Sequence, residues 1–277
     1  MNLDELTRMY NFAGQTFVVT GGLSALGGEI ACALAGCGAN IAILDINLES
    51  STRLLERMGD HTNRTLIVAG DVLSLDSLKQ AAEQIVLRFG RVDGLLNAAG
   101  GNRPQATTNA QTSFFDLSTE GLRSVLDLNV MGTVLPCQIF GKLMAQQGAG
   151  VILNFASMSS FRPLSRIPAY SGAKAGVANF TQWLAVHMAK EYSPQIRVNA
   201  LAPGFFITPQ NRFLLTDDKT GELTPRGQAV VAHTPMGRFG KPEDLVGTAL
   251  WLLSPASAFV TGIVVPIDGG FSAYSGV

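Results

Sequence analysis

The chain has 277 residues, of which 47% are apolar and 15% are charged, and its formal net charge is −1. This length and apolar content suit one large domain with a sizeable core. A near-neutral chain without a basic block is not expected to bind nucleic acid, and no uncharged apolar run reaches the roughly 18 residues of a membrane span.

The three cysteines and three histidines show no spacing typical of a metal site or a disulfide framework. Cys32 and Cys37 fall within one predicted helix and the turn after it, so together with Cys137 they are expected to be core thiols of a reducing compartment. The first ten residues carry charges and have no apolar core, which is not the pattern of a signal peptide. We therefore expect a cytoplasmic protein that binds no metal.

Short apolar runs alternate with helical patterns along the chain. The order is typical of a Rossmann-type, doubly wound α/β fold, in which helices cover both faces of a parallel, seven-stranded sheet. Strands are expected at residues 16–20, 40–44, 65–69, 92–96, 151–155, 196–201 and 262–266. Helices are expected at residues 25–35, 48–58, 75–89, about 119–146, 168–192 and 242–254.

Two segments interrupt this alternation. Residues 101–115 form a polar loop that is long for such a fold, and long loops are commonly functional. Residues 205–235 are expected to be irregular, and we take about 205–240 as a mobile substrate flap. Because no change in composition marks a linker, we predict an N-terminal extension at residues 1–13 and a single domain at residues 14–277.

A Gly-rich turn, Thr20-Gly-Gly-Leu-Ser-Ala-Leu-Gly-Gly28, lies between the first predicted strand and helix. Glycines let the backbone approach a pyrophosphate, and a helix N-terminus favours its negative charge. Asp45 closes the second strand, where a carboxylate accepts hydrogen bonds from a ribose diol and repels a 2′-phosphate. We therefore expect NAD(H) to be favoured over NADP(H).

Tyr170 and Lys174 form a second chemical signal. They are four residues apart on a predicted helix, so they lie on one face of it, one turn from each other. A cation beside a phenol lowers its pKa from the usual value of about 10. Tyr170 is therefore expected to exchange a proton with a substrate oxygen near neutral pH, with Ser157 donating a hydrogen bond to the same oxygen.

With these features the chain resembles a short-chain dehydrogenase/reductase from about Gly14 to Gly270. One position departs from the family turn Thr-Gly-x-x-x-Gly-x-Gly, because Ala25 replaces the middle glycine; this is expected to affect cofactor affinity rather than binding itself. The matching residues occur in family order and are the 20–28 turn, Asp71-Val72, Asn97-Ala-Ala-Gly100, Asn129, Ser157, Tyr170-x-x-x-Lys174 and Pro203-Gly204.

The resemblance implies catalytic roles for four residues. Tyr170 would be the acid/base, and Lys174 would bind the nicotinamide ribose and lower the pKa of Tyr170. Ser157 would orient the substrate carbonyl or hydroxyl. Asn129 would hold a water molecule that links Lys174 to solvent.

It also implies cofactor contacts. Asp71 would bond the adenine amino group, Val72 would flank the ring, and Asn97 would steady the sheet and the nucleotide. Ile207 and Thr208 would meet the carboxamide and the phosphates. The full implied set is Gly21, Leu23, Ser24, Leu26, Asp45, Asp71, Val72, Asn97, Ala98, Gly100, Tyr170, Lys174, Pro203, Gly204, Ile207 and Thr208.

A narrower resemblance concerns the substrate. Stretches outside the general family motifs are similar to the D-mannonate oxidoreductase (D-fructuronate reductase) branch. This implies reversible hydride transfer between NAD(H) and C5 of a six-carbon sugar acid, with D-fructuronate and NADH giving D-mannonate and NAD. The stretches include Gly100-Gly-Asn102, Asn179-Phe-Thr-Gln-Trp-Leu-Ala185, Pro203-Gly-Phe-Phe206, Thr208-Pro-Gln-Asn-Arg212, Thr234-Pro-Met-Gly-Arg-Phe-Gly240 and the ending from Asp268 to Val277.

A sugar acid needs a cation for its carboxylate and polar groups for its hydroxyls, and an arginine fork suits a carboxylate. We expect Arg212 to bind the carboxylate first, with Arg162 or Arg166 as the next candidates. The predicted substrate-binding residues are Asn102, Arg162, Gln210 and Arg212.

Two other classes of function stay open. One is a different dehydrogenase of this fold, such as a gluconate 5-dehydrogenase or a 3-oxoacyl carrier reductase, although the latter should show a basic patch for its acidic carrier. The other is a non-catalytic NAD-sensing or scaffold protein, which intact Ser157, Tyr170 and Lys174 disfavour.

The resemblance also implies partners. Family members usually form tetramers through the helices at residues 119–146 and 168–192 and through the last strand. The expected partners are therefore a small sugar-acid substrate and further copies of this chain, a homotetramer, with no nucleic acid and no membrane.

Overall fold

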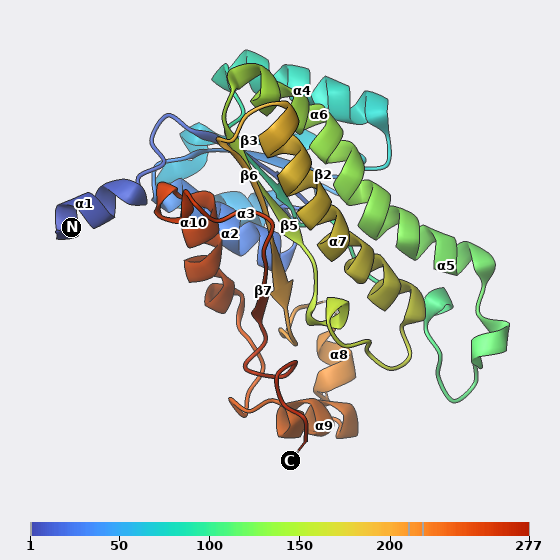
Figure 1. The fold of residues 1–277 in the computed structure, drawn as a ribbon. Helices are drawn as coiled ribbons and strands as arrows, with labels where there is room; N and C mark the ends of the chain where they lie inside the picture. Colours follow the sequence, from blue (N-terminus) through green and yellow to red (C-terminus); the bar gives the residue numbers. More distant parts are fainter. Residues whose placement is uncertain (1, 210, 218, 277) are drawn as a thin grey trace.

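The computed structural model describes residues 2–209, 211–217 and 219–276. Its centre is a parallel sheet of seven strands in the order β3-β2-β1-β4-β5-β6-β7 (Figure 1). The order reverses direction between β1 and β4, so the predicted doubly wound fold is confirmed. The strands are β1 (Thr16–Thr20), β2 (Asn40–Asp45), β3 (Thr65–Ala69), β4 (Gly94–Asn97), β5 (Gly150–Phe155), β6 (Ile196–Pro203) and β7 (Val264–Ile267).

Helices surround this sheet, and the short α8 and α9 lie below it in the view of Figure 1. None of the helices in the described ranges is long and apolar enough to cross a bilayer. The α-helices are α1 (Leu3–Met9), α2 (Ala25–Gly36), α3 (Ser51–Met58), α4 (Leu75–Phe89), α5 (Thr119–Leu126), α6 (Gly132–Gln147), α7 (Pro168–Glu191), α8 (Arg212–Leu215), α9 (Pro225–His233) and α10 (Val246–Leu253).

Alternate residues of each strand face opposite sides of the sheet, and each side has its own apolar core. In β1, Phe17 and Val19 pack in the core that α2 and α10 cover. Val18 between them packs in the core that α4, α6 and α7 cover. A strand covered on both faces is apolar throughout, which explains the continuous apolar runs of the sequence.

Phe12 joins the N-terminal extension to this core. Helix α1 buries none of its residues, yet Phe12 is fully buried, and its ring meets that of Phe17 edge-on with centroids 5.2 Å apart. Burying such a ring stabilises a fold by about 1.5–3 kcal/mol. The packed part of the chain therefore begins before the boundary that we predict at residue 13.

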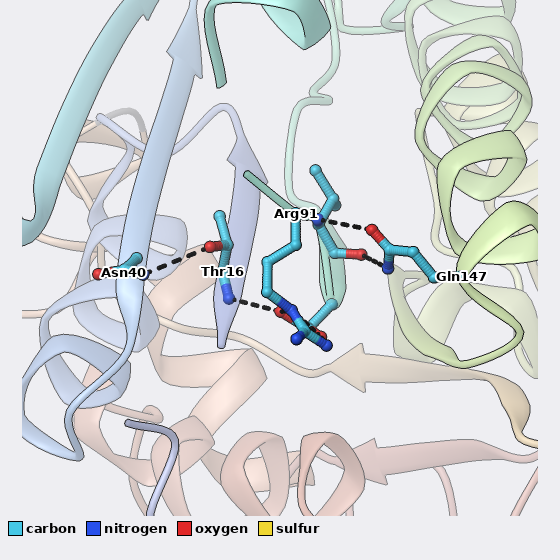
Figure 2. Close-up of polar contacts among 6 residues, drawn as sticks. Thr16, Asn40, Arg91 and Gln147 are labelled. Atoms are coloured by element: carbon cyan, nitrogen blue, oxygen red, sulfur yellow. Dashed lines mark hydrogen bonds and ion pairs between the residues drawn. The ribbon is translucent and has the colours of Figure 1, made fainter. Parts of the chain in front are cut away.

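Side chains join the strands at their N-terminal ends, the edge of the sheet away from the Gly-rich turn (Figure 2). Asp93, which precedes β4, accepts a hydrogen bond of 2.9 Å from the backbone N–H of Thr16 in β1 and pairs with Arg91. Gln147 at the end of α6 accepts from the N–H of Val92 at 3.1 Å and donates to its carbonyl at 2.7 Å. These contacts satisfy backbone groups that the sheet leaves open.

The helix predicted at residues 119–146 is in fact two helices. A π-helical turn, Asp127–Met131, separates α5 from α6. Within it, Asn129 Nδ2 donates 2.8 Å to the carbonyl of Val125, four residues earlier. A side chain that takes a backbone acceptor competes with the regular ladder and favours such a wide turn, which apolar periodicity does not reveal.

The expectation that residues 205–235 are irregular is wrong, because this segment contains α8 and α9. The start of α9 carries local signals for a helix. Thr224 Oγ1 accepts from the N–H of Gly227 at 3.1 Å, and Pro225 occupies the first helical position. The helix is short and its apolar pattern is weak, so these cap signals were the only indication.

Several ends of elements also differ, as is usual for boundaries drawn from patterns. The helix expected from residue 48 begins at Ser51, and the last predicted helix starts as a 3₁₀ turn, Pro242–Leu245. The strands expected at residues 92–96 and 262–266 run instead at Gly94–Asn97 and Val264–Ile267.

Candidate active site

The structure brings Ser157, Tyr170 and Lys174 to one cavity of about 380 Å³. Ser157 lies two residues after the end of β5, in extended backbone, and its hydroxyl accepts a hydrogen bond of 3.2 Å from the N–H of Ser159. Tyr170 and Lys174 lie in the first two turns of α7. The helix therefore presents its phenol and its ammonium to the C-terminal edge of the sheet, where ligands bind in doubly wound folds.

Lys174 is almost fully buried, with 4% of its surface exposed. Its Nζ donates a hydrogen bond of 2.7 Å to the backbone carbonyl of Phe155, the last residue of β5. Burial away from water lowers the pKa of Lys174 to about 8. The ammonium is thus fixed in direction by a neutral acceptor.

The phenol of Tyr170 differs from the sequence expectation. Its pKa is raised above the ordinary value by burial, and the hydrogen bond with Ser157 opposes this only in part. Lys174 Nζ lies 5.7 Å from the centre of the Tyr170 ring and donates a hydrogen bond to the carbonyl of Phe155. The expectation that the pKa of Tyr170 is lowered is therefore wrong, because the effect of desolvation is the largest. At neutral pH the phenol is protonated, the form that donates a proton.

Asn129 fixes the loop that follows β4. Its Oδ1 accepts from the N–H of Gly101 at 3.2 Å, and its Nδ2 donates to the carbonyl of Gly101 at 2.7 Å. Between them, Gly100 leaves no room for a side chain: a Cβ there would lie 2.8 Å from Asn129 Oδ1 and 3.2 Å from Lys174 Nζ. Asn129 and Lys174 thus converge on one backbone position. The water molecule that the resemblance implies at Asn129 stays a prediction.

The Gly-rich turn borders the same cavity through Leu23, Ser24 and Leu26, and through Ala25. Ser24 caps α2 by accepting from the N–H of Gly27 at 3.2 Å. Ala25, the residue that departs from the family turn, is the first residue of α2. Its methyl group therefore sits at the cavity wall.

Asp45 reaches this turn from the end of β2. Its Oδ2 accepts a hydrogen bond of 3.1 Å from the N–H of Leu23, and its Oδ1 accepts from the N–H of Asn47 at 3.3 Å. A carboxylate has about four acceptor sites, so Asp45 retains capacity for two hydroxyl groups of a ribose.

The residues present fit a nicotinamide dinucleotide. A single cavity is lined both by the N-terminal turn of α2, whose backbone N–H groups suit a pyrophosphate, and by the Ser157, Tyr170 and Lys174 side chains. Ala98, Gly100, Pro203, Gly204 and Thr208, all expected to bind cofactor, line it as well.

Six expected cofactor residues are not among those that line the cavity, and Asp45, described above, is one of them. Gly21 has φ +62° and a Cβ there would lie 2.7 Å from the backbone of Ala99, so its role is to let two chain segments meet. Asp71 Oδ1 accepts from the N–H of Leu73 at 2.9 Å. The others are buried Val72, Asn97, and Ile207.

Asn97 belongs to the sheet interior. Its Nδ2 donates to Asn154 Oδ1 at 2.9 Å and to Cys137 Sγ at 3.2 Å. Asn154 in turn donates to Thr181 Oγ1 at 2.9 Å, which links β4, β5 and α7. The Oδ1 atom of Asn97 has no hydrogen-bond partner among the described residues. These contacts explain how Asn97 would steady the sheet.

The expected substrate residues are not gathered in the cavity wall. Asn102 Nδ2 donates to Thr107 Oγ1 at 2.7 Å, and the side chains of Arg162 and Arg212 are exposed. Gln210 lies outside the described residues. Their roles in substrate binding stay predictions.

Two aromatic residues line the cavity without having been expected as ligand contacts, Phe205 and Phe206. Asn211, a polar residue of the loop expected to frame the cleft, lines it as well. Asn211 Oδ1 accepts from the N–H of Thr208 and its Nδ2 donates to the carbonyl of Phe206, both at 2.8 Å. Phe155 contributes a backbone carbonyl, which has no signature in a sequence.

Comparison with known proteins agrees with this geometry. The family profile described as enoyl-(acyl carrier protein) reductase (adh_short_C2) matches residues 21–272. An uncharacterized oxidoreductase of Bacillus subtilis (strain 168), UxuB, is 46% identical over 276 residues, which cover 96% of this chain and 98% of that protein. The 2-dehydro-3-deoxy-D-gluconate 5-dehydrogenase of Escherichia coli (strain K12) is 32% identical over 265 residues, which cover 95% and 98%.

A solved structure is similar over nearly the whole length. It is a crystal structure, with bound NAD, of a protein from Haemophilus influenza named as a candidate D-mannonate oxidoreductase. It is 42% identical, has a TM-score of 0.90, and the match covers 98% of this chain and 100% of the other. The chain therefore belongs to the short-chain dehydrogenase/reductase family, and it is an oxidoreductase that acts on CH–OH and C=O groups.

Proposed function

We propose that this enzyme transfers a hydride between NAD(H) and C5 of a six-carbon sugar acid, reducing D-fructuronate to D-mannonate in one direction. The observation that carries the chemistry is the cavity shared by Ser157, Tyr170, Lys174 and the N-terminal turn of α2. The substrate is supported by the sequence stretches similar to the D-mannonate oxidoreductase branch, and by the name of the similar structure from Haemophilus influenza.

In the proposed reduction, bound NADH supplies the hydride that the carbonyl carbon accepts. The phenol of Tyr170 donates its proton to the carbonyl oxygen, which becomes the new hydroxyl. Ser157 donates a hydrogen bond to that oxygen and so orients the carbonyl toward the phenol of Tyr170 and the nicotinamide. Lys174, held by the carbonyl of Phe155, places a positive charge beside the oxygen as negative charge develops on it.

Asp45 supports the choice of NAD(H) over NADP(H). Its carboxylate is anchored by the N–H of Leu23 at the start of the site. A 2′-phosphate at this place would meet a negative charge, whereas a ribose diol would find an acceptor. Asp71 and Val72 are proposed to contact the adenine.

The test is NADH oxidation with a panel of carbonyl substrates, D-fructuronate, 5-ketogluconate and an acetoacetyl thioester, at matched concentrations. We expect turnover with D-fructuronate to exceed that with the others by at least about tenfold in kcat/KM. Fastest turnover of 5-ketogluconate would instead favour a gluconate-type 5-dehydrogenase, a reading supported by the relative from Escherichia coli. Turnover of none would contradict the proposed substrate and point to a dehydrogenase for another carbonyl compound.

The proposal includes a role in carbohydrate metabolism in the cytoplasm and a homotetrameric assembly. Exposed apolar side chains on α7, Trp183 at 54% and Val186 at 59%, support an interface on that helix. Light scattering after size exclusion tests the assembly, with a mass of about four chains expected and a single-chain mass contradicting it.

A further inference from the structure

The hydroxyl of Ser160 joins the turn that carries Ser157 to the helix that carries Lys174. Ser160 ends the 3₁₀ turn Met158–Ser160, which begins directly after Ser157. Its Oγ donates a hydrogen bond of 2.7 Å to the backbone carbonyl of Lys174, fourteen residues further along the chain. Its N–H donates to the carbonyl of Ser157 at 2.8 Å. Two hydrogen bonds from one residue thus connect Ser157 with Lys174.

Lys174 is held at both ends by the segment on which Ser157 lies. Its ammonium donates to the carbonyl of Phe155 at 2.7 Å, and its own carbonyl accepts from Ser160. Phe155 is the last residue of β5 and Ser160 closes the following turn, so Ser157 lies between the two contacts in the sequence. The position of Ser157 relative to α7, which also carries Tyr170, therefore depends on both contacts.

The hydrogen bond from Ser160 is not needed to satisfy the backbone of α7. In an α-helix each interior carbonyl already accepts the N–H four residues later, and a carbonyl oxygen has two lone pairs. Lys174 lies in the interior of α7, Pro168–Glu191. Removal of the Ser160 hydroxyl therefore leaves no buried acceptor without a partner, and we expect its cost in stability to be small. What is lost is a constraint between the turn and the helix.

A second serine keeps the loop attached to α7 when the Ser160 contact is removed. Ser171, which follows Tyr170, is buried, and its Oγ accepts a hydrogen bond of 3.2 Å from the N–H of Leu164 in the same loop. Ser160 itself is partly exposed and lines a second cavity of about 610 Å³, which gives space for an added methyl group. Changes at Ser160 should therefore leave the fold intact and shift the turn alone.

We propose that Ser160 is a positioning residue for the reduction, which holds the hydroxyl of Ser157 where it and the phenol of Tyr170 reach one substrate oxygen. This step rests on the proposed mechanism, in which both groups bond to that oxygen. The requirement is strict, since a displacement of about 1 Å in a catalytic group can lower a rate by about 100-fold. Ser160 does not line the catalytic cavity, so it acts through Ser157 rather than on the substrate.

The experiment compares Ser160→Ala and Ser160→Thr with wild type. Ser193→Ala is the matched control, because Ser193 Oγ also donates to a backbone carbonyl, that of Gly148 at 2.6 Å. This contact lies before the starts of β5 and β6, at the edge of the sheet away from the site. Single-turnover oxidation of bound NADH by D-fructuronate gives the rate of the reduction. A titration gives the Kd for NADH, and thermal melting gives the stability of each variant.

We expect Ser160→Ala to lower the single-turnover rate by about 10–100-fold, with the Kd for NADH within about twofold of wild type. Ser160→Thr keeps the hydroxyl and should stay within about threefold of the wild-type rate. Both alanine variants should lower the melting temperature by a similar amount, at most about 4 °C, but Ser193→Ala should keep the wild-type rate. A merely structural role of Ser160 would lower the melting temperature and leave the rate unchanged.

The double variant Ser157→Ala/Ser160→Ala tests whether Ser160 acts through Ser157. If it does, the addition of Ser160→Ala to Ser157→Ala should change the rate by less than about threefold, because the group that Ser160 positions is already gone. An equal loss of rate in the presence and in the absence of the Ser157 hydroxyl would overturn the inference. An unchanged rate in Ser160→Ala alone would overturn it as well.

Failure of the proposed function is a separate result. If wild type reduces a different carbonyl compound, the same variants are measured with that compound, and the expectations for Ser160 stay the same. If Ser157→Ala keeps the wild-type rate, the proposed role of Ser157 is wrong, and the inference about Ser160 is overturned with it.

Discussion

Lys174 Nζ donates a hydrogen bond of 2.7 Å to the carbonyl oxygen of Phe155, so the end of β5 holds the catalytic ammonium in place. The acceptor is neutral, and Lys174 is buried with no ion-pair partner among the described residues. Burying a charge in this way costs stability and is retained here beside the reactive phenol.

Because burial of the Lys174 charge costs stability, we predict that Lys174→Met stabilises the protein while it abolishes activity. The pKa of Lys174 falls from its ordinary 10.5 to about 8 in the folded chain. Below about pH 8 the group is charged in both states, and the folded chain bears the full cost of its burial. Between about pH 8 and 10.5 the folded chain has lost the proton and the unfolded chain keeps it, so the cost shrinks steadily with rising pH and is gone near pH 10.5.

We therefore expect Lys174→Met to raise the free energy of unfolding by on the order of 1 kcal/mol at pH 7, after the lost hydrogen bond is included. The gain should shrink as pH rises through that window. Urea unfolding at pH 7 and pH 10 measures it, with exposed Lys142→Met as a control that shows no such trend. A variant less stable than wild type at pH 7 would contradict this account.

Gly100→Ala tests the convergence of Asn129 and Lys174. The new methyl group would lie 2.8 Å from Asn129 Oδ1 and 3.2 Å from Lys174 Nζ, so one of them must move. We expect kcat to fall by about 100-fold, since small displacements of catalytic groups have effects of this size. Gly172→Ala in α7 meets nothing within 4 Å and should keep wild-type kcat. Equal kcat of Gly100→Ala and Gly172→Ala would contradict the claim that Asn129 and Lys174 close in on the backbone of Gly100.

Asp45→Asn tests the selection of the cofactor. The amide oxygen can still accept from the N–H of Leu23, so the turn should keep its shape while losing its negative charge. We expect the preference for NADH over NADPH in kcat/KM to fall by at least about tenfold. Glu49→Gln, a neighbouring change of the same charge, is the control. If the preference is unaltered, Asp45 does not set it.

Asp93→Ala tests the polar network at the other edge of the sheet. The N–H of Thr16 loses its acceptor at 2.9 Å, and an unsatisfied, partly buried donor costs about 1–3 kcal/mol. Asp76→Ala, in an exposed pair with Lys79, should change stability by less than about 0.5 kcal/mol. Thermal unfolding measures both, and equal destabilisation would show that the network is not structural. Neither variant should alter KM, because this edge lies away from the site.

Much of the fold follows from local signals in the sequence. Helix α4 begins and ends where predicted because Ser74 caps its start, accepting from the N–H of Ser77, and Gly90 ends it with φ 78°. The strands are visible as apolar runs because both faces of the sheet are covered. The π-turn in the α5–α6 region was missed, since it depends on how Asn129 bonds to the backbone.

The site shows the same division. Tyr170 and Lys174 were identified because helical spacing places them on one face. The direction in which the pKa of Tyr170 shifts was predicted wrongly, because it depends on burial, which only the folded chain has.

The most direct test of the catalytic account is single-turnover oxidation of bound NADH by D-fructuronate in wild type and Tyr170→Phe, with NADH affinity measured alongside. The account predicts turnover by wild type, a rate at least about 100-fold lower in the variant, and NADH affinity within about twofold. A Tyr170→Phe variant that keeps the wild-type rate would contradict the assignment of Tyr170 as the proton donor.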